Sequence, residues 1–197
     1  MGSDDNDDPG TFPAVLSSTG SRRRRILRHD LARFVRPAIP DNRGFLVRAG
    51  WYVVNATVFQ GALLGLVPSS IKAHILRRFG ARVWRGLVCK PRVSIKYPWF
   101  LSLGDDVWLG EGVWIDNHCG VTIGSSTCVS QGCYLFTGNH DYNDVAFAFF
   151  AKPIRIGEGA WIGARVVVPP GSVVPDGTVV GCGYDLVADR QGSGHVD

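Results

Sequence analysis

The chain has 197 residues, of which 45% are hydrophobic and 19% charged, a composition that excludes wholesale disorder and fits one domain with a sizeable core. Its net charge of +4 hides an asymmetry, because residues 1–100 carry 17 Lys and Arg against 6 Asp and Glu, whereas residues 101–197 carry 4 against 11. No acidic residue lies between Asp41 and Asp105, which predicts a basic surface suited to phosphates or anionic lipid. A nucleic-acid partner is disfavoured, since no zinc-finger, RNP-type or helix-turn-helix pattern accompanies the charge.

Residues 1–25 predict a disordered tail, because an acidic run is followed by Ser, Gly and four arginines. They lack the basic start and apolar core of a secretory signal, which favours a cytoplasmic protein. The five cysteines form no CxxC pair, so they predict free thiols and neither a zinc site nor a disulfide framework.

Residues 26–80 predict a helical N-terminal segment, with helix-like patterns at 30–40 and 44–79. The run 49–71 holds 23 residues without a charge, but polar residues and glycines interrupt it too often for a membrane span. We expect a helix that either packs on the rest of the protein or lies on a membrane surface beside the basic residues that follow. Association with the inner face of the membrane is therefore one of two alternatives.

An aliphatic residue recurs every six positions from Leu103 onward, with two breaks in phase. The twelve anchors of this repeat are Leu103, Leu109, Ile115, Ile123, Val129, Leu135, Ile156, Ile162, Val168, Val174, Val180 and Leu186. A period of six fits no amphipathic helix and predicts a mainly β protein, a parallel β-helix with three short strands in each coil, over residues 81–187. Six anchors are followed by Gly, which we expect to tolerate a turn geometry that a Cβ would obstruct. An ordinary β-sandwich would alternate with period two instead.

The two phase breaks predict loops. Two extra residues separate Ile115 from Ile123, and 21 positions separate Leu135 from Ile156. An insertion cannot enter the core of a solenoid, so residues 136–155 are expected to form an excluded loop, where functional residues gather.

Three segments, at 96–115, 121–142 and 153–183, carry a resemblance to a known family, most specifically TGNHD followed by PIRIGEGAWIG. The chain resembles the left-handed β-helix, hexapeptide-repeat acyltransferases, and among them the colanic acid biosynthesis O-acetyltransferases. The resemblance implies a homotrimer that transfers acetyl from acetyl-CoA directly to a hydroxyl of a sugar or a lipid-linked oligosaccharide in surface polysaccharide biosynthesis. No metal is expected.

The resemblance also implies roles for individual residues. His140 matches the family's general base, which would take the proton of the acceptor hydroxyl. Asn139, Asp141 and Tyr142 are candidates to bind the substrate or to position His140. Further candidate substrate contacts, for which a solvated turn is the alternative, are Asp116, Asn117 and His118. Candidate contacts of acetyl-CoA, which plain coil packing would also explain, are Trp161, Gly163, Ala164 and Cys182.

After Gly183 the sequence departs from the family, because a polar stretch replaces the basic segment that usually helps to hold the phosphates of CoA. Residues 188–197 predict a disordered tail, and weak binding of CoA is expected. A catalytically weak or inactive trimeric β-helix scaffold therefore remains an alternative function. A metalloenzyme like the γ-class carbonic anhydrases would need three His ligands, but only His118 and His140 lie in the coil region.

Overall fold

The structure, a computed structural model, describes residues 30–35, 43–61 and 67–183. The tails expected at 1–25 and 188–197, and the last predicted anchor, Leu186, lie outside these residues. The helices are η1 (Leu31–Arg33), α1 (Phe45–Val54), η2 (Asn55–Phe59, a π-helix), α2 (Ser69–Arg78) and η4 (Pro98–Phe100).

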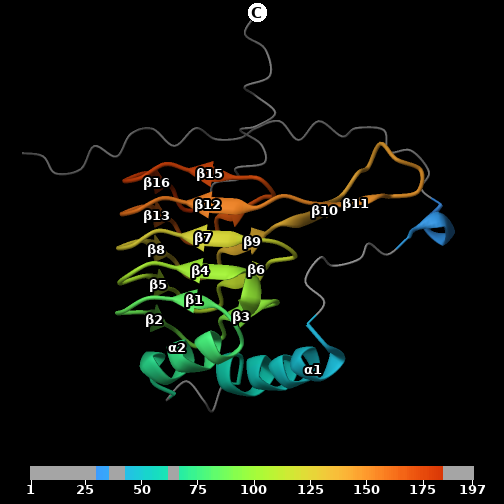
Figure 1. Ribbon diagram of the computed structural model, residues 1–197. Coiled ribbons are helices and arrows are strands. Elements are labelled where there is room, and N and C mark those ends of the chain that lie inside the picture. Colours follow the sequence, from blue (N-terminus) through green and yellow to red (C-terminus); the bar gives the residue numbers. More distant parts are fainter. Residues whose placement is uncertain (1–29, 36–42, 62–66, 184–197) are drawn as a thin grey trace, which may run out of the picture.

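Most strands belong to three parallel sheets that form the faces of a triangular solenoid (Figure 1). The first sheet, sheet A, contains β1 (Arg82–Val83), β4 (Leu101–Leu103), β7 (Val121–Ile123), β12 (Ile154–Ile156) and β15 (Val173–Val174). Sheet B contains β2 (Val88–Cys89), β5 (Trp108–Leu109), β8 (Cys128–Val129), β13 (Trp161–Ile162) and β16 (Val179–Val180). Sheet C contains β3 (Ser94–Ile95), β6 (Trp114–Asp116), β9 (Tyr134–Phe136) and β14 (Val167–Val168). This topology confirms the predicted parallel β-helix.

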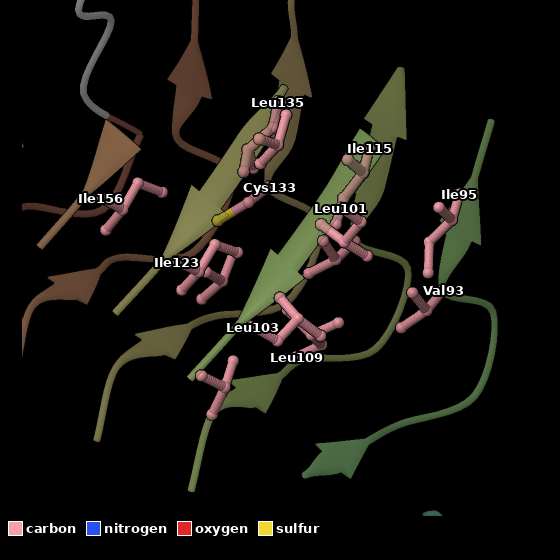
Figure 2. Packing of buried hydrophobic residues seen from close by; sticks show 14 of the residues in the cluster. Val93, Ile95, Leu101, Leu103, Leu109, Ile115, Ile123, Cys133, Leu135 and Ile156 are labelled. Atoms are coloured by element: carbon pink, nitrogen blue, oxygen red, sulfur yellow. The ribbon is translucent and has the colours of Figure 1, made fainter. Parts of the chain in front are cut away.

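The anchors fill the interior of the solenoid. Every anchor from Leu103 to Val180 is at most 7% exposed, and each stacks on its counterpart in the next coil, as in the register of Leu103 with Ile123 (Figure 2). Burying one such Leu or Ile side chain stabilises the fold by about 1.5–3 kcal/mol. The hydrophobic stack is therefore continuous from coil to coil.

The solenoid begins one coil earlier than the anchors from Leu103 indicate. Val83, Cys89 and Ile95 are buried and pair with Leu103, Leu109 and Ile115. This coil escapes a search for the repeat because no Gly follows its anchors and eight positions, instead of six, separate Ile95 from Leu103.

The expected reason for the glycines after the anchors is wrong. A Cβ on Gly104 or Gly110 would lie 2.5 Å from a backbone nitrogen of the next coil, and neither residue has a positive φ. These glycines are therefore required by the close approach of two coils and not by a turn. The left-handed conformation occurs two residues further on, at Gly112 and even at Asp106 and Ser126.

Helices α1, η2 and α2 lie across the end of the solenoid that carries the first coil (Figure 1). On sheet C, the indole nitrogen of Trp51 donates a hydrogen bond to the carbonyl oxygen of Ile95 at 2.9 Å. The amide oxygen of Asn55 accepts from the nitrogen of Ile95 at 3.2 Å. An open strand edge would otherwise template pairing with another chain, so these two side chains close the edge of β3.

The other two sheets are closed in the same way by α2. The hydroxyl of Ser69 accepts from the nitrogen of Cys89, and the buried amine of Lys72 donates to the Cys89 carbonyl at 3.0 Å. Arg77 donates to the carbonyl of Val83 at 2.7 Å. Each strand of the first coil thus has a polar side chain on its edge, which satisfies buried backbone groups that no further coil pairs.

The N-terminal segment is less helical than expected at its start. Of the predicted helix at 30–40, the described part holds only the turn η1, after which Phe34 is extended. The uncharged run at 49–71 is divided between α1–η2 and α2. Within the described parts of the chain, no helix is long and apolar enough to cross a membrane.

The close approach of coils predicts a position-specific cost of adding a methyl group. Gly110→Ala should lower the free energy of unfolding by about 2–3 kcal/mol, because its Cβ would overlap the backbone of Ser130 and Gln131. Gly181→Ala is the matched control, since Gly181 also follows an anchor but a Cβ added there would meet no atom within 4 Å. Urea unfolding of both variants measures the difference, and equal values would refute this account of the repeat.

Candidate active site

The corner between sheet C and sheet A is enlarged in three successive coils. Anchors are eight positions apart from Ile95 to Leu103 and from Ile115 to Ile123, and 21 apart from Leu135 to Ile156, compared with six elsewhere. All three insertions therefore leave the solenoid at the same corner. In the third coil the chain forms an antiparallel hairpin of β10 (Gly138–His140) and β11 (Phe149–Ala151), which extends away from the solenoid (Figure 1).

A cavity of about 800 Å³ lies at this corner. Its walls come from the enlarged corners, the hairpin and α1. Phe34 joins them from the N-terminal segment, which is held to the hairpin by a hydrogen bond from the Asp30 nitrogen to the Val145 carbonyl at 2.9 Å. The cavity thus unites segments that lie about a hundred positions apart in the sequence.

His140 lines this cavity with a defined ring orientation. Its Nδ1 lies 2.7 Å from the carbonyl oxygen of Phe147. A carbonyl only accepts hydrogen bonds, so Nδ1 carries the proton and Nε2 of the neutral ring keeps its lone pair. The ring is also stacked on the Phe147 ring at 4.2 Å and contacts the rings of Phe34 and Phe149. These contacts hold one side chain that is able to accept a proton.

The turn of the hairpin positions the Phe147 carbonyl. Asp141 accepts a hydrogen bond from the Asn143 nitrogen, Asp144 accepts from the Ala146 nitrogen, and Phe147 itself has a φ of 55°. Such aspartate-capped turns are local and are encoded in the residues themselves. Asp141 therefore builds the turn, and neither Asp141 nor Tyr142, both expected as substrate contacts, is among the residues that line the cavity.

A second histidine lies in the same cavity beside two charged groups. The amine of Lys96 lies 2.7 Å from Oδ1 of Asp116 and 3.0 Å from Nε2 of His118, to which it donates. Asp116 also accepts from the hydroxyl of Tyr134 at 3.4 Å. Burial, and then the charge of Lys96, lowers the pKa of His118 against the opposing effect of Asp116. His118 is thus held neutral, with Nε2 as an acceptor.

Asn117, which the sequence suggested as a substrate contact, is not among the residues that line the cavity. It is fully buried, its amide nitrogen donates to the Tyr97 carbonyl at 2.7 Å, and its amide oxygen accepts from the Tyr97 nitrogen at 3.0 Å. Both polar atoms of the side chain are therefore used to join two enlarged corners. Asn139, by contrast, does line the cavity, next to His140.

The four residues expected to contact acetyl-CoA lie around a different corner. Trp161 is on β13 and points outward, with its indole nitrogen donating to Ser130 at 2.9 Å. Gly163 and Ala164 follow β13, between sheets B and C, and Cys182 follows β16 at the same corner. Sheet C separates this corner from His140, so one chain does not bring the two sets together.

Several cavity residues carry no motif. Lys96, Asp116 and Phe136 each directly follow an anchor of sheet C, at the position where Gly follows other anchors. Arranging the sequence in three columns by its repeat would have revealed them as a set. Arg48 and Tyr52 of α1 give no such signal, because only the packing of the helix brings them to the cavity.

No group of three or more His, Cys, Asp or Glu that could hold a metal ion occurs among the described residues. The carbonic anhydrase alternative therefore gains no support from the described cavity.

No protein-family model matches the chain. It is similar to the "Putative colanic acid biosynthesis acetyltransferase WcaF" of Escherichia coli (strain K12), with 43% identity over 131 residues that cover 66% of this chain and 71% of the relative. It is also similar to nodulation protein L of Rhizobium leguminosarum bv. viciae, with 29% identity over 49% of this chain and 52% of the relative.

Solved structures with the same fold include a galactoside acetyltransferase in complex with coenzyme A, with a TM-score of 0.61, 22% identity and coverage of 70% of this chain and 69% of that one. Another is a hexapeptide-repeat-containing acetyltransferase, VCA0836, from Vibrio cholerae, with a TM-score of 0.59, 19% identity and coverage of 72% and 87%. These likenesses confirm the left-handed β-helix.

The lowered pKa of His118 predicts a dependence of stability on pH. The unfolded chain binds this proton near the ordinary pKa of 6.5, more readily than the folded chain does. The free energy of unfolding should therefore decrease as the pH falls below about 6.5, until the lowered pKa is reached. Urea unfolding between pH 7.5 and 5.5, values of about one unit on either side of that pKa, should show a shallower decrease for His118→Gln. Parallel curves for the two proteins would contradict the shift.

Proposed function

The chain belongs to the family of hexapeptide-repeat acetyltransferases, and from that premise we propose that it transfers acetyl from acetyl-CoA to a sugar hydroxyl in surface polysaccharide biosynthesis. The observation that carries the proposal is the hydrogen bond between Nδ1 of His140 and the Phe147 carbonyl. It leaves Nε2 as the proton acceptor in a cavity of a size suited to a sugar.

The proposed reaction is a direct transfer in a ternary complex. Nε2 of His140 takes the proton of the acceptor hydroxyl while its oxygen attacks the thioester carbonyl. The resulting tetrahedral intermediate collapses to the ester, and the sulfur of CoA leaves with the proton that the imidazolium returns. Nothing in the described residues favours an acyl-cysteine: burial raises the pKa of Cys119, next to His118, and raises that of Cys133 to about 11, and Cys182 lies at the other corner.

The cavity supports a sugar as the acceptor. Aromatic rings of Tyr134, Phe136 and Phe149 line it, and such rings offer apolar faces to the C–H groups of a sugar. Polar atoms of Asn139, Asp116 and Lys96 lie among them, able to bind hydroxyls. The name of the E. coli relative makes an acceptor from colanic acid or a similar polysaccharide the first choice for assay.

We further propose a homotrimer in which a neighbouring copy completes each active site. Trp161, Gly163, Ala164 and Cys182 of that copy would contact acetyl-CoA, opposite His140 of the first. This proposal is supported by the hairpin, which carries His140 away from its own solenoid, and by the exposed aromatic rings of Trp108 and Trp161 on sheet B. A cytoplasmic location is supported by the absence of a disulfide among the five cysteines.

Removing the base should separate catalysis from folding. His140→Ala should lower turnover about 10²–10⁴-fold, the usual contribution of a positioned base, while the thermal midpoint changes little. His74→Ala is the matched control, because His74 is exposed on α2 and does not line the cavity. Release of CoA from acetyl-CoA in the presence of sugar acceptors measures turnover.

Unchanged turnover of the His140 variant would remove this residue from the mechanism. A wild-type protein that forms trimers but releases no CoA with any acceptor would favour the inactive scaffold.

Mixing two inactive variants tests the shared site. Chains with His140→Ala and chains with Ala164→Trp, which would fill the proposed CoA channel, should each be inactive alone. Co-expressed at equal levels, they should restore about a quarter of wild-type activity, because a random trimer pairs an intact histidine with an intact channel at one interface in about four. No recovery in mixed trimers of normal mass would place the site within one chain.

A further inference from the structure

We propose that the outward face of α1 and η2, together with the basic end of the solenoid around it, docks on an anionic lipid bilayer. The proposal concerns a surface that lies outside the acetyl-transfer chemistry, and its test does not depend on that chemistry.

The outward face of α1 and η2 is apolar. Phe45 is 73% exposed, Leu46 81% and Val53 64%, and the exposed positions that continue this side along the helix are Ala56 and Thr57. No charged residue lies on it, although exposed helix faces of globular proteins are ordinarily charged. Uncharged, exposed side chains at helical spacing are typical of a surface that meets an apolar partner.

The orientation of the helix is fixed, so the exposure of this face is a property of the fold. The opposite side carries Trp51, Asn55 and Phe59, all at most 6% exposed. Trp51 and Asn55 hold the edge of β3 through the hydrogen bonds to Ile95. Rotating the helix to bury Leu46 and Val53 would break both bonds, and the edge of β3 would lose its cap.

The surroundings of this face are basic. Between residues 42 and 104 the chain carries ten Lys and Arg and no acidic residue. Lys72 is buried and three others pair with carboxylates of the second coil, and the other six lie in or next to the helices and the first coil. Arg78 at the end of α2, Arg82 on β1 and Lys90 after β2 are exposed at this end of the molecule. A basic rim around an apolar helix face matches the two layers of an anionic membrane, headgroups and acyl chains.

This charge complementarity favours lipid over a protein partner. Each Lys or Arg near an anionic leaflet contributes a similar attraction, without needing a matched carboxylate. The inserted residues, chiefly Phe45, Leu46 and Val53, lie along one helix and suit shallow insertion at the boundary between headgroups and acyl chains.

The docking face borders the active-site cavity, because Arg48 and Tyr52 of the same helix line it. Resting on the proposed function, this continuity deepens it: an acceptor carried on a lipid would reach the cavity along the side of α1. A soluble acceptor would gain nothing from the arrangement.

The test is co-sedimentation with vesicles in the absence of acetyl-CoA and acceptor. Wild-type protein should bind vesicles that contain about 30% phosphatidylglycerol more tightly than pure phosphatidylcholine vesicles, and the difference should shrink as salt is raised. Val53→Glu should weaken binding to the anionic vesicles by about tenfold or more, because it places a charge where an apolar side chain inserts. The double variant Arg78→Gln/Arg82→Gln should lose part of the preference for anionic lipid while retaining the normal fold.

Val173→Glu is the matched control, because Val173 is 69% exposed, close to the 64% of Val53, and lies on β15 in the last described coil. It should bind as the wild type does. Equal loss in both glutamate variants, or no loss in Val53→Glu, would overturn the proposal, as would equal and salt-insensitive binding to neutral and anionic vesicles. A wild type that binds neither kind of vesicle would overturn it too and would assign the face to a protein partner. Turnover with a soluble sugar, measured separately, tests the proposed reaction independently.

Discussion

Successive coils approach each other at the spacing of hydrogen-bonded parallel strands, about 4.8 Å, and the other features of the molecule follow from this approach. It excludes a Cβ at Gly104 and Gly110, where the backbone of the next coil lies 2.5 Å away. It also stacks each anchor on the next, so the interior leaves no room for an insertion. Extra residues have to leave at a corner, and three consecutive coils use the same corner for them.

The shared corner gives the cavity its chemistry. Side chains that would face solvent on a regular coil are gathered there, and the two histidines are held in different ways. His140 is oriented by a backbone carbonyl, whereas His118 accepts from the amine of Lys96. Because a carbonyl cannot donate and an ammonium cannot accept, both neutral rings carry their proton on Nδ1, and the lone pair on Nε2 of His118 is taken by Lys96. Of the two Nε2 atoms, these contacts leave that of His140 for a substrate.

The parts of the fold that can be predicted from sequence are those with a local, repeated cause. The anchors of the β-helix recur because every coil has the same geometry, and the position of the long insertion follows from the break in phase. The first coil lies within the predicted bounds of 81–187, but its anchors escape the repeat because no Gly follows them and eight positions separate Ile95 from Leu103. His140 stands out through a motif, and its orientation by Phe147 depends on turn residues close in sequence.

The remainder of the site depends on contacts between distant segments, which no local pattern records. Asn117 has the character of a polar loop residue, yet both its polar atoms are taken by Tyr97 of the preceding coil. Arg48 reaches the cavity because Trp51, one turn away, is locked onto Ile95. The separation of His140 from Trp161 arises from the triangular cross-section, so spacing along the chain gives no measure of it.

The cap formed by α1, η2 and α2 also implies an order in which the coils fold. These helices precede the coils in sequence, so a ribosome completes them before the strands that they cover. Once the first coil is docked beneath Trp51, Lys72 and Arg77, each later coil adds to an existing edge, one at a time. The strand edge open to a wrong partner during synthesis is then always the newest one, at the growing end, and never the one at the base.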